Sequence, residues 1–156
     1  MKALGKLLVK SAIIPHLAAN NAEDVVSALG NRLEDAGYVK NTFVQAALTR
    51  EQSMPTGLPL MGDANAAIPH TDIEHVLKPG VALATLIDPV VFQNMANPKN
   101  PVEVKIVFLL ALDQPKAQIE MLQEIAGVLQ SPEIIEKLIK AENAEEVFQI
   151  LQAQSQ

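Results

Sequence analysis

The sequence contains no cysteine and no tryptophan, and its 156 residues include only one tyrosine and four phenylalanines. Without cysteine there is no disulfide bond, no thiolate nucleophile and no cysteine-ligated zinc site. The chain has 12 Lys+Arg against 18 Asp+Glu, a formal charge of −6, so it offers neither a basic stripe for phosphates nor aromatic platforms for bases. We therefore expect neither a disulfide-stapled secreted fold nor nucleic-acid binding.

Long hydrophobic runs are also absent. The longest, from Ile106 to Leu112, is far shorter than the roughly 20 residues that cross a bilayer. Lys6 and Lys10 interrupt the N-terminal apolar stretch before it reaches the length of a signal peptide. We therefore expect a cytoplasmic protein in which residues 1–156 form a single domain around one core, built from the 49% of apolar residues.

Several helices are predicted by their ends. Asn21 is a suitable N-cap, apolar residues at helical spacing follow it, and Gly37 fits the left-handed position at a helix end. A second helix is expected at about 41–51. Pro115 and Pro132 are typical of the first turn of two further helices, and a last helix is expected at about 144–152.

Strand candidates lie between these helices, at 13–15, 66–68, 81–87 and 102–112. The last of them begins by alternating and ends as an apolar run, which indicates a strand that becomes covered on both faces. Residues 52–65 hold two prolines and two glycines and are predicted to form a loop. We therefore predict an α/β fold with a mixed, roughly five-stranded sheet flanked by helices on both faces.

Three histidines can titrate near neutral pH without help from their surroundings. His16 lies in the first apolar strand and is interpreted as structural. His75 follows His70 by five residues, which does not place two imidazoles on one helical face, so no metal site is expected. His70 stands directly after a strand and Pro69, at the carboxyl end where open α/β sheets bind ligands; by position alone, a solvent-facing histidine remains the alternative.

Four short motifs decide between these interpretations, and together they resemble the enzyme IIA domains of the phosphoenolpyruvate-dependent sugar phosphotransferase system. The similarity is to the fructose/mannitol superfamily, especially its galactitol-type branch, and covers nearly the whole chain. The motifs, in chain order, are Arg50-Glu51, Pro55-Thr56-Gly57-Leu58, Ala67-Ile68-Pro69-His70-Thr71-Asp72 and Phe92-Gln93-Asn94-Met95.

The resemblance implies a role for particular residues. His70 would accept a phosphoryl group from the carrier protein HPr and pass it to a cysteine of a IIB domain, with Arg50 beside the phosphohistidine. Many fructose- and mannitol-type members carry a second active-site histidine at the start of the helix after the long strand. This sequence has Gln118 there, as galactitol-type members do. No bound cofactor is required, and contact with the membrane would be indirect, through a IIC component.

The chemistry of phosphoryl transfer suits these residue types. One imidazole nitrogen needs a free lone pair, so the other must hold its proton against an acceptor; a backbone carbonyl or Asp72 would serve equally. Arg50 offers a planar fork of donors to the phosphoryl oxygens. Thr56, Gly57, Asp72 and Gln118 are weaker candidates for stabilising the phosphate, and Thr56 is equally a turn residue and Gln118 a solvated helix position.

Two questions stay open at this stage. Around the loop, the apolar side chains of Met54, Leu58, Leu60 and Met61 either cover the core or form a docking surface. The resemblance favours a transport component for a galactitol-like polyol, and the alternative is a regulatory, nitrogen-type IIA protein whose phosphorylation on His70 controls binding to another protein.

Overall fold

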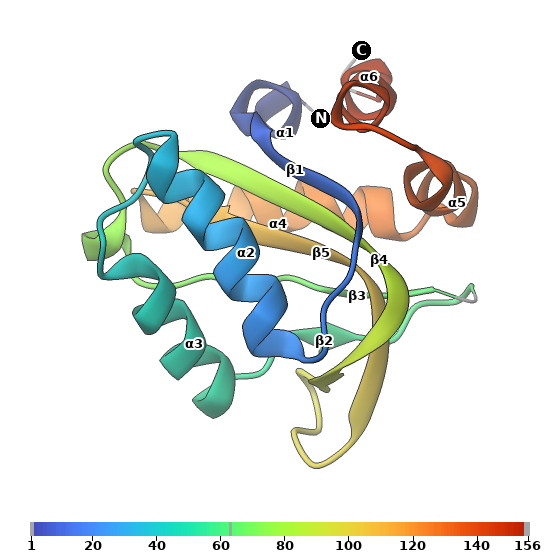
Figure 1. Cartoon of the computed structure of the whole chain (residues 1–156), viewed down its shortest axis with the longest axis horizontal. Helices are drawn as coiled ribbons and strands as arrows, with labels where there is room; N and C mark the ends of the chain where they lie inside the picture. Colours follow the sequence, from blue (N-terminus) through green and yellow to red (C-terminus); the bar gives the residue numbers. More distant parts are fainter. Residues whose placement is uncertain (1, 63, 155–156) are drawn as a thin grey trace.

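A five-stranded mixed sheet forms the centre of the computed structural model, which describes residues 2–62 and 64–154 (Figure 1). The strand order is β1-β4-β5-β3-β2. The strands are β1 (Leu8–Leu17), β2 (Gly57–Leu58), β3 (Asn65–Ala67), β4 (Gly80–Gln93) and β5 (Pro101–Ala111). β1 pairs with β4 and β3 with β5 in parallel, whereas β4 with β5 and β2 with β3 are antiparallel. The predicted mixed sheet is therefore confirmed.

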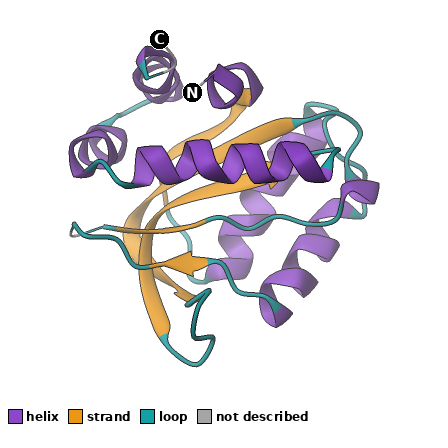
Figure 2. Cartoon of the chain, turned by 180° about the vertical axis from the view of Figure 1, so that it is seen from behind, coloured by secondary structure: helices purple, strands orange, loops and turns teal. Residues whose placement is uncertain are grey.

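Helices cover both faces of this sheet, as predicted. On one face lie α2 (Ala22–Asp35) and α3 (Phe43–Ser53), and a short 3-10 helix, η1 (Ile73–His75), follows β3. The other face carries α1 (Lys2–Leu7), α4 (Pro115–Leu129), α5 (Pro132–Lys140) and α6 (Ala144–Ala153). Figure 2 shows α4 lying across this second face.

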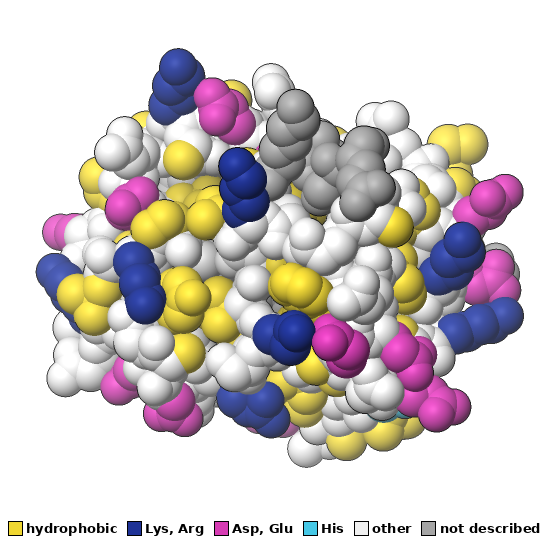
Figure 3. Space-filling view, turned by 90° about the horizontal axis from the view of Figure 1, so that it is seen from above, with side chains coloured by type: hydrophobic (Ala, Val, Ile, Leu, Met, Phe, Trp, Pro, Cys, Tyr) yellow, Lys and Arg dark blue, Asp and Glu magenta, His cyan; other side chains and the backbone are white. Residues whose placement is uncertain are grey.

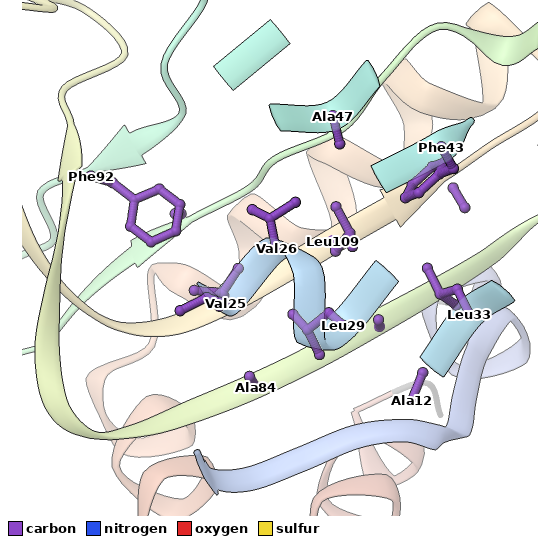
Figure 4. Packing of buried hydrophobic residues seen from close by; sticks show 14 of the residues in the cluster. Ala12, Val25, Val26, Leu29, Leu33, Phe43, Ala47, Ala84, Phe92 and Leu109 are labelled. Carbon is purple, nitrogen blue, oxygen red and sulfur yellow. The ribbon is translucent and has the colours of Figure 1, made fainter. Parts of the chain in front are cut away.

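The sheet separates two hydrophobic cores, one on each face, where the chain length led us to expect one. The reason is that successive side chains of a strand point to opposite faces. In β5, Val107 and Leu109 belong to the core under α2 and α3, while Phe108 and Leu110 belong to the core under α4. Figure 4 shows the first core, in which Leu29 of α2 and its neighbours pack toward the sheet. The sheet is thereby held on both sides, and its edge provides a rigid base for a site.

The predicted helix ends are also confirmed. The side-chain oxygen of Asn21 accepts the N–H of Asp24 at 2.8 Å, and Gly37, just after α2, has φ +85°. Pro115 and Pro132 lie in the first turns of α4 and α5, where a missing N–H costs no helical hydrogen bond. The remaining predicted boundaries differ from the observed ones by one or two residues, as for α3, which was expected at 41–51.

Three segments differ more. The N-terminal residues form α1 and a ten-residue β1, where the sequence indicated only a short strand at 13–15. The predicted loop contains the two residues of β2. β4 continues to Gln93 rather than ending at 87: Thr85 lies opposite Ile106 and Val90 opposite Val104, so a bulge in β4 accommodates Pro89.

The surface carries charges of both signs. Figure 3, seen from above Figure 1, shows basic and acidic side chains interspersed among apolar ones on that face. Within the described ranges, no helix combines the length and the apolar character needed to span a membrane.

Candidate active site

His70 lies at the carboxyl end of β3, where the chain continues alongside β5. The carbonyl of Pro69 accepts the N–H of Leu110 at 3.0 Å, and His70 forms an isolated parallel bridge with Leu110. Because β3 and β5 are parallel, their carboxyl ends meet at the same edge of the sheet, and the chain leaves β5 there to begin α4. His70, the residues that follow it and the first turn of α4 are thus brought to one edge.

The ring of His70 is half-buried, and its Nδ1 lies 3.1 Å from the backbone carbonyl oxygen of Ile68. A carbonyl oxygen only accepts hydrogen bonds, so Nδ1 carries the proton and Nε2 keeps its lone pair. The sequence left two acceptors open, a backbone carbonyl and Asp72. In the structure the carbonyl oxygen of Ile68 is the acceptor next to Nδ1.

The surroundings also keep this ring neutral. Burial lowers the pKa of His70 from its ordinary value of 6.5, and the hydrogen bond to Ile68 opposes that effect. The charge of Arg50 lowers the pKa further, whereas the charge of Asp72 raises it. An imidazole with a lowered pKa is neutral, and therefore nucleophilic, near pH 7.

Arg50 projects from the last turn of α3 toward the segment that follows His70. Its Nη1 donates to Oδ1 of Asp72 at 3.1 Å, and the side chains of Arg50 and Asp72 are 29% and 69% exposed. Among the described residues, Nε of Arg50 is buried and has no hydrogen-bond partner. The guanidinium is therefore only partly engaged and retains donors for an anion at this edge.

Gln118 reaches the same segment from α4. Its Nε2 donates to the backbone carbonyl of Thr71 at 3.2 Å. This contact ties the first turns of α4 to the residue directly after His70. Gln118 is therefore placed beside the histidine segment, with an amide that holds the backbone there.

Thr56 and Gly57 lie beside the strand that leads to His70. Thr56 is buried, and both its backbone N–H and its hydroxyl donate to the carboxylate of Glu51, each at 2.8 Å. Gly57 lies so close to β4 that a Cβ at this position would be 2.6 Å from the carbonyl oxygen of Gln93. The hydroxyl hydrogen of Thr56 is thus already used within the chain, and Gly57 is required by a close backbone approach.

Glu51 is the residue of this region to which the sequence analysis assigned no role. Burial raises its pKa to about 6, against the opposing effect of the backbone and side-chain hydrogen bonds from Thr56. Its position after Arg50 in the motif was visible in the sequence, but its contact with Thr56 depends on how the chain turns between α3 and β2.

The other two histidines make separate contacts. Nε2 of His16 lies 3.0 Å from the carbonyl oxygen of Ile139, and Nδ1 of His75 lies 2.9 Å from the hydroxyl of Thr42. In the part of the chain that the structure describes, no three His, Cys, Asp or Glu residues are grouped as metal ligands.

Two hollows adjoin the site. One of about 650 Å³ follows α3 past Arg50 to Met54 and is bordered by Asp72 and His75. The other, of about 460 Å³, is apolar and lies between residues 58–61 and α4. Of the four apolar loop residues, Leu58 and Leu60 pack against the core, whereas Met54 and Met61 are 57% and 96% exposed.

Comparisons with known proteins identify the family. The model of the family described as "Phosphoenolpyruvate-dependent sugar phosphotransferase system, EIIA 2" matches residues 6–154. The galactitol-specific EIIA component of Escherichia coli (strain K12) is 35% identical over 116 residues, which cover 74% of this chain and 76% of the relative.

Solved structures are similar as well. The crystal structure of mannitol enzyme IIA from Escherichia coli has a TM-score of 0.74 and 26% identity, covering 92% of this chain and 98% of that one. In the complex of mannitol enzyme IIA with phosphorylated mannitol enzyme IIB, also from Escherichia coli, the TM-score is 0.75 and the identity 25%, covering 94% and 97%. The chain therefore belongs to the EIIA 2 family of the phosphoenolpyruvate-dependent sugar phosphotransferase system, whose members are phosphoryl-carrying phosphotransferase components.

Proposed function

We propose that this chain is a IIA component that takes a phosphoryl group from phospho-HPr onto Nε2 of His70 and passes it to a cysteine of a IIB component. The main support is the hydrogen bond between Nδ1 of His70 and the Ile68 carbonyl, because it leaves Nε2 as the nitrogen with a free lone pair. The bound IIB in the structure of mannitol enzyme IIA supports a IIB acceptor.

Both transfers balance without any net movement of protons. In the first, the lone pair of Nε2 forms the bond to phosphorus while the donor's N–P bond breaks and its electron pair returns to the donor imidazole. In the second, a IIB thiolate forms the S–P bond and the electron pair of the His70 N–P bond returns to Nε2. The proton stays on Nδ1 of His70 throughout, where it is donated to the carbonyl oxygen of Ile68.

Arg50 stabilises the charge that spreads over the phosphoryl oxygens during each transfer. Asp72 holds the guanidinium beside the ring in the unphosphorylated protein, and the phosphoryl group then competes with this exposed carboxylate for the same donors. Gln118 holds the Thr71 backbone and supplies a second polar group next to the phosphate. Thr56 and Gly57 act indirectly: their backbone hydrogen bonds and pairing with Ile68 and Ala67 fix the strand end that carries His70.

A protein partner is favoured by exposed apolar residues that follow the site residues in the chain. Met54 follows Arg50 in the chain, and Ile73 directly follows Asp72. Both side chains are at least 40% exposed, and so is that of Ile119 in α4. The charge of −6 favours approach to a basic surface around the phosphohistidine of HPr. Since both partners use the same histidine in turn, each interface is small and transient.

The substrate system is proposed to be one for a galactitol-like polyol. The 35% identity to a galactitol-specific component supports this, as does glutamine at position 118. The whole chain would work as one IIA domain in the cytoplasm, without a metal or bound cofactor, and would meet the membrane only through IIC.

Incubation with phosphoenolpyruvate, enzyme I and HPr, followed by intact mass measurement, tests the proposal. We expect one acid-labile phosphoryl group on the wild type and none on His70→Gln. His75→Gln is the matched control, because its ring also lies near Arg50 and Asp72 in the fold but contacts Thr42; it should be phosphorylated normally. A phosphorylated His70→Gln protein would refute the assignment.

Adding a IIB component then separates transport from regulation. A transport component loses its phosphoryl group to the IIB cysteine. A regulatory IIA protein keeps it and instead forms a stoichiometric complex with another protein in only one phosphorylation state.

A further inference from the structure

Glu51 is a partly buried acidic residue that takes no direct part in the phosphoryl chemistry described above. Both of its carboxylate oxygens are used: Oε2 accepts the backbone N–H of Thr56 and Oε1 accepts its hydroxyl, each at 2.8 Å. Thr56 itself is only 3% exposed. The carboxylate therefore accepts two hydrogen bonds from Thr56 and fixes both the backbone and the side chain of that residue.

The backbone continues this connection to the active-site ring. The carbonyl of Thr56 accepts the N–H of Ile68 at 3.3 Å, and the carbonyl of Ile68 in turn lies 3.1 Å from Nδ1 of His70. Directly beyond Thr56, the antiparallel pairing of Gly57 with Ala67 keeps the two segments in register. Hydrogen bonds thus link the last turn of α3 to the imidazole through Thr56 and Ile68.

We propose that Glu51 is a positioning residue for the phosphoryl acceptor: through Thr56 and Ile68 it fixes the carbonyl that holds His70 as the Nδ1–H tautomer. This inference deepens the proposed function and rests on it. One turn of α3 then serves both sides of the reaction, because Arg50 provides charge for the phosphoryl oxygens and Glu51 orients the nucleophile.

The chemistry of the residue supports a specific role. Burying a carboxylate is unfavourable, and here burial raises its pKa to about 6. An apolar residue would fill the same space without that cost, but it would leave the N–H and hydroxyl of the buried Thr56 without their acceptor. The two hydrogen bonds are therefore what the acidic side chain provides.

Two substitutions separate the hydrogen bonds from the charge. In Glu51→Gln, the amide oxygen accepts the Thr56 N–H and the amide nitrogen donates to its hydroxyl oxygen, so both contacts persist. In Glu51→Ala, both are lost. Gln52→Ala, at the exposed next position of the same helix, is the control for a substitution in this turn.

The readout is the tautomer of His70 in the unphosphorylated protein. It is measured at about pH 8, where the imidazole is neutral, by long-range ¹H–¹⁵N correlation of the ring nitrogens. We expect the Nδ1–H tautomer in the wild type, Glu51→Gln and Gln52→Ala, and a mixture of tautomers in Glu51→Ala. Phosphoryl acceptance should fall ~10- to ~100-fold in Glu51→Ala alone, since small displacements of a reacting group are costly.

Two results would overturn the inference. One is a Glu51→Ala protein that keeps the wild-type tautomer; the other is a Glu51→Gln protein that loses it. Should Glu51→Ala not fold, Thr56→Val removes the hydroxyl contact alone, and an unchanged tautomer there would equally overturn it. The tautomer is measured without HPr, so the two proposals can fail separately. If the tautomer changes in Glu51→Ala but the wild type accepts no phosphoryl group, the proposed function is rejected and the positioning role of Glu51 is kept.

Discussion

Replacing Glu51 with glutamine should change how the stability of the protein depends on pH. Burial raises the pKa of Glu51 from 4.5 to about 6, so between these values the folded protein binds a proton that the unfolded chain releases. At 1.36 kcal/mol for each pKa unit, this rise corresponds to about 2 kcal/mol. The cost is absent below about pH 4.5, where both states are protonated, and complete above about pH 6, where both are ionised.

Glutamine does not ionise, so the free energy of unfolding of the variant does not include the cost of ionising this carboxyl group. The free energy of unfolding of Glu51→Gln minus that of the wild type should therefore increase by about 2 kcal/mol from about pH 4 to about pH 7. Taking the difference cancels the contribution of every group that titrates alike in both proteins.

Urea denaturation followed by far-UV circular dichroism at several pH values measures this difference. Glu34→Gln, an exposed substitution in α2, is the control for the same substitution at the surface. A difference for Glu51→Gln that is constant within about 0.5 kcal/mol over this range would show that burial does not perturb the carboxyl group.

Further predictions concern the site and the sheet beside it. Nuclear magnetic resonance titration should show the pKa of His70 rising in Arg50→Ala and falling in Asp72→Asn, because the arginine charge lowers that pKa and the carboxylate raises it; shifts of the same sign would contradict the geometry. Arg50→Ala should keep its fold by circular dichroism but slow phosphoryl transfer by ~10²- to ~10³-fold, and unchanged transfer kinetics would remove Arg50 from the site. Gly57→Ala should destabilise the protein by about 1 to 3 kcal/mol, because its Cβ would meet a carbonyl oxygen of β4 at 2.6 Å. Gly127→Ala, with open space around it in helix α4, should instead stabilise by about 0.5 to 1 kcal/mol, and chemical denaturation of the two variants checks both signs.

Local signals predicted most of the elements of this fold. Asn21 and Gly37 define the ends of α2 through hydrogen bonds and backbone angles that depend on only a few neighbouring residues. The apolar end of β5 likewise showed that both faces of the sheet are covered, since every residue of that run is buried. Such features can be predicted from the sequence because the residues that cause them are near neighbours in the chain.

Elements held by distant partners were not predictable in the same way. β1 is ten residues long because it pairs with β4, although Lys10 and Pro15 obscure its pattern in the sequence. β4 runs past Pro89 because a bulge against β5 absorbs the proline. In both strands, pairing across the sheet outweighs the local preference.

The sequence by itself determined which chemical groups are available: an imidazole after a strand end, a guanidinium near a helix end and a glutamine near the start of another helix. Only the tertiary structure decided how they are used. The Ile68 carbonyl on Nδ1, the Asp72 carboxylate on Arg50 and the grip of Glu51 on Thr56 all depend on the folded path of the chain. A side chain's identity is encoded locally, but its hydrogen-bond partner, and hence its tautomer and pKa, is chosen by whichever segments the sheet brings to the same edge.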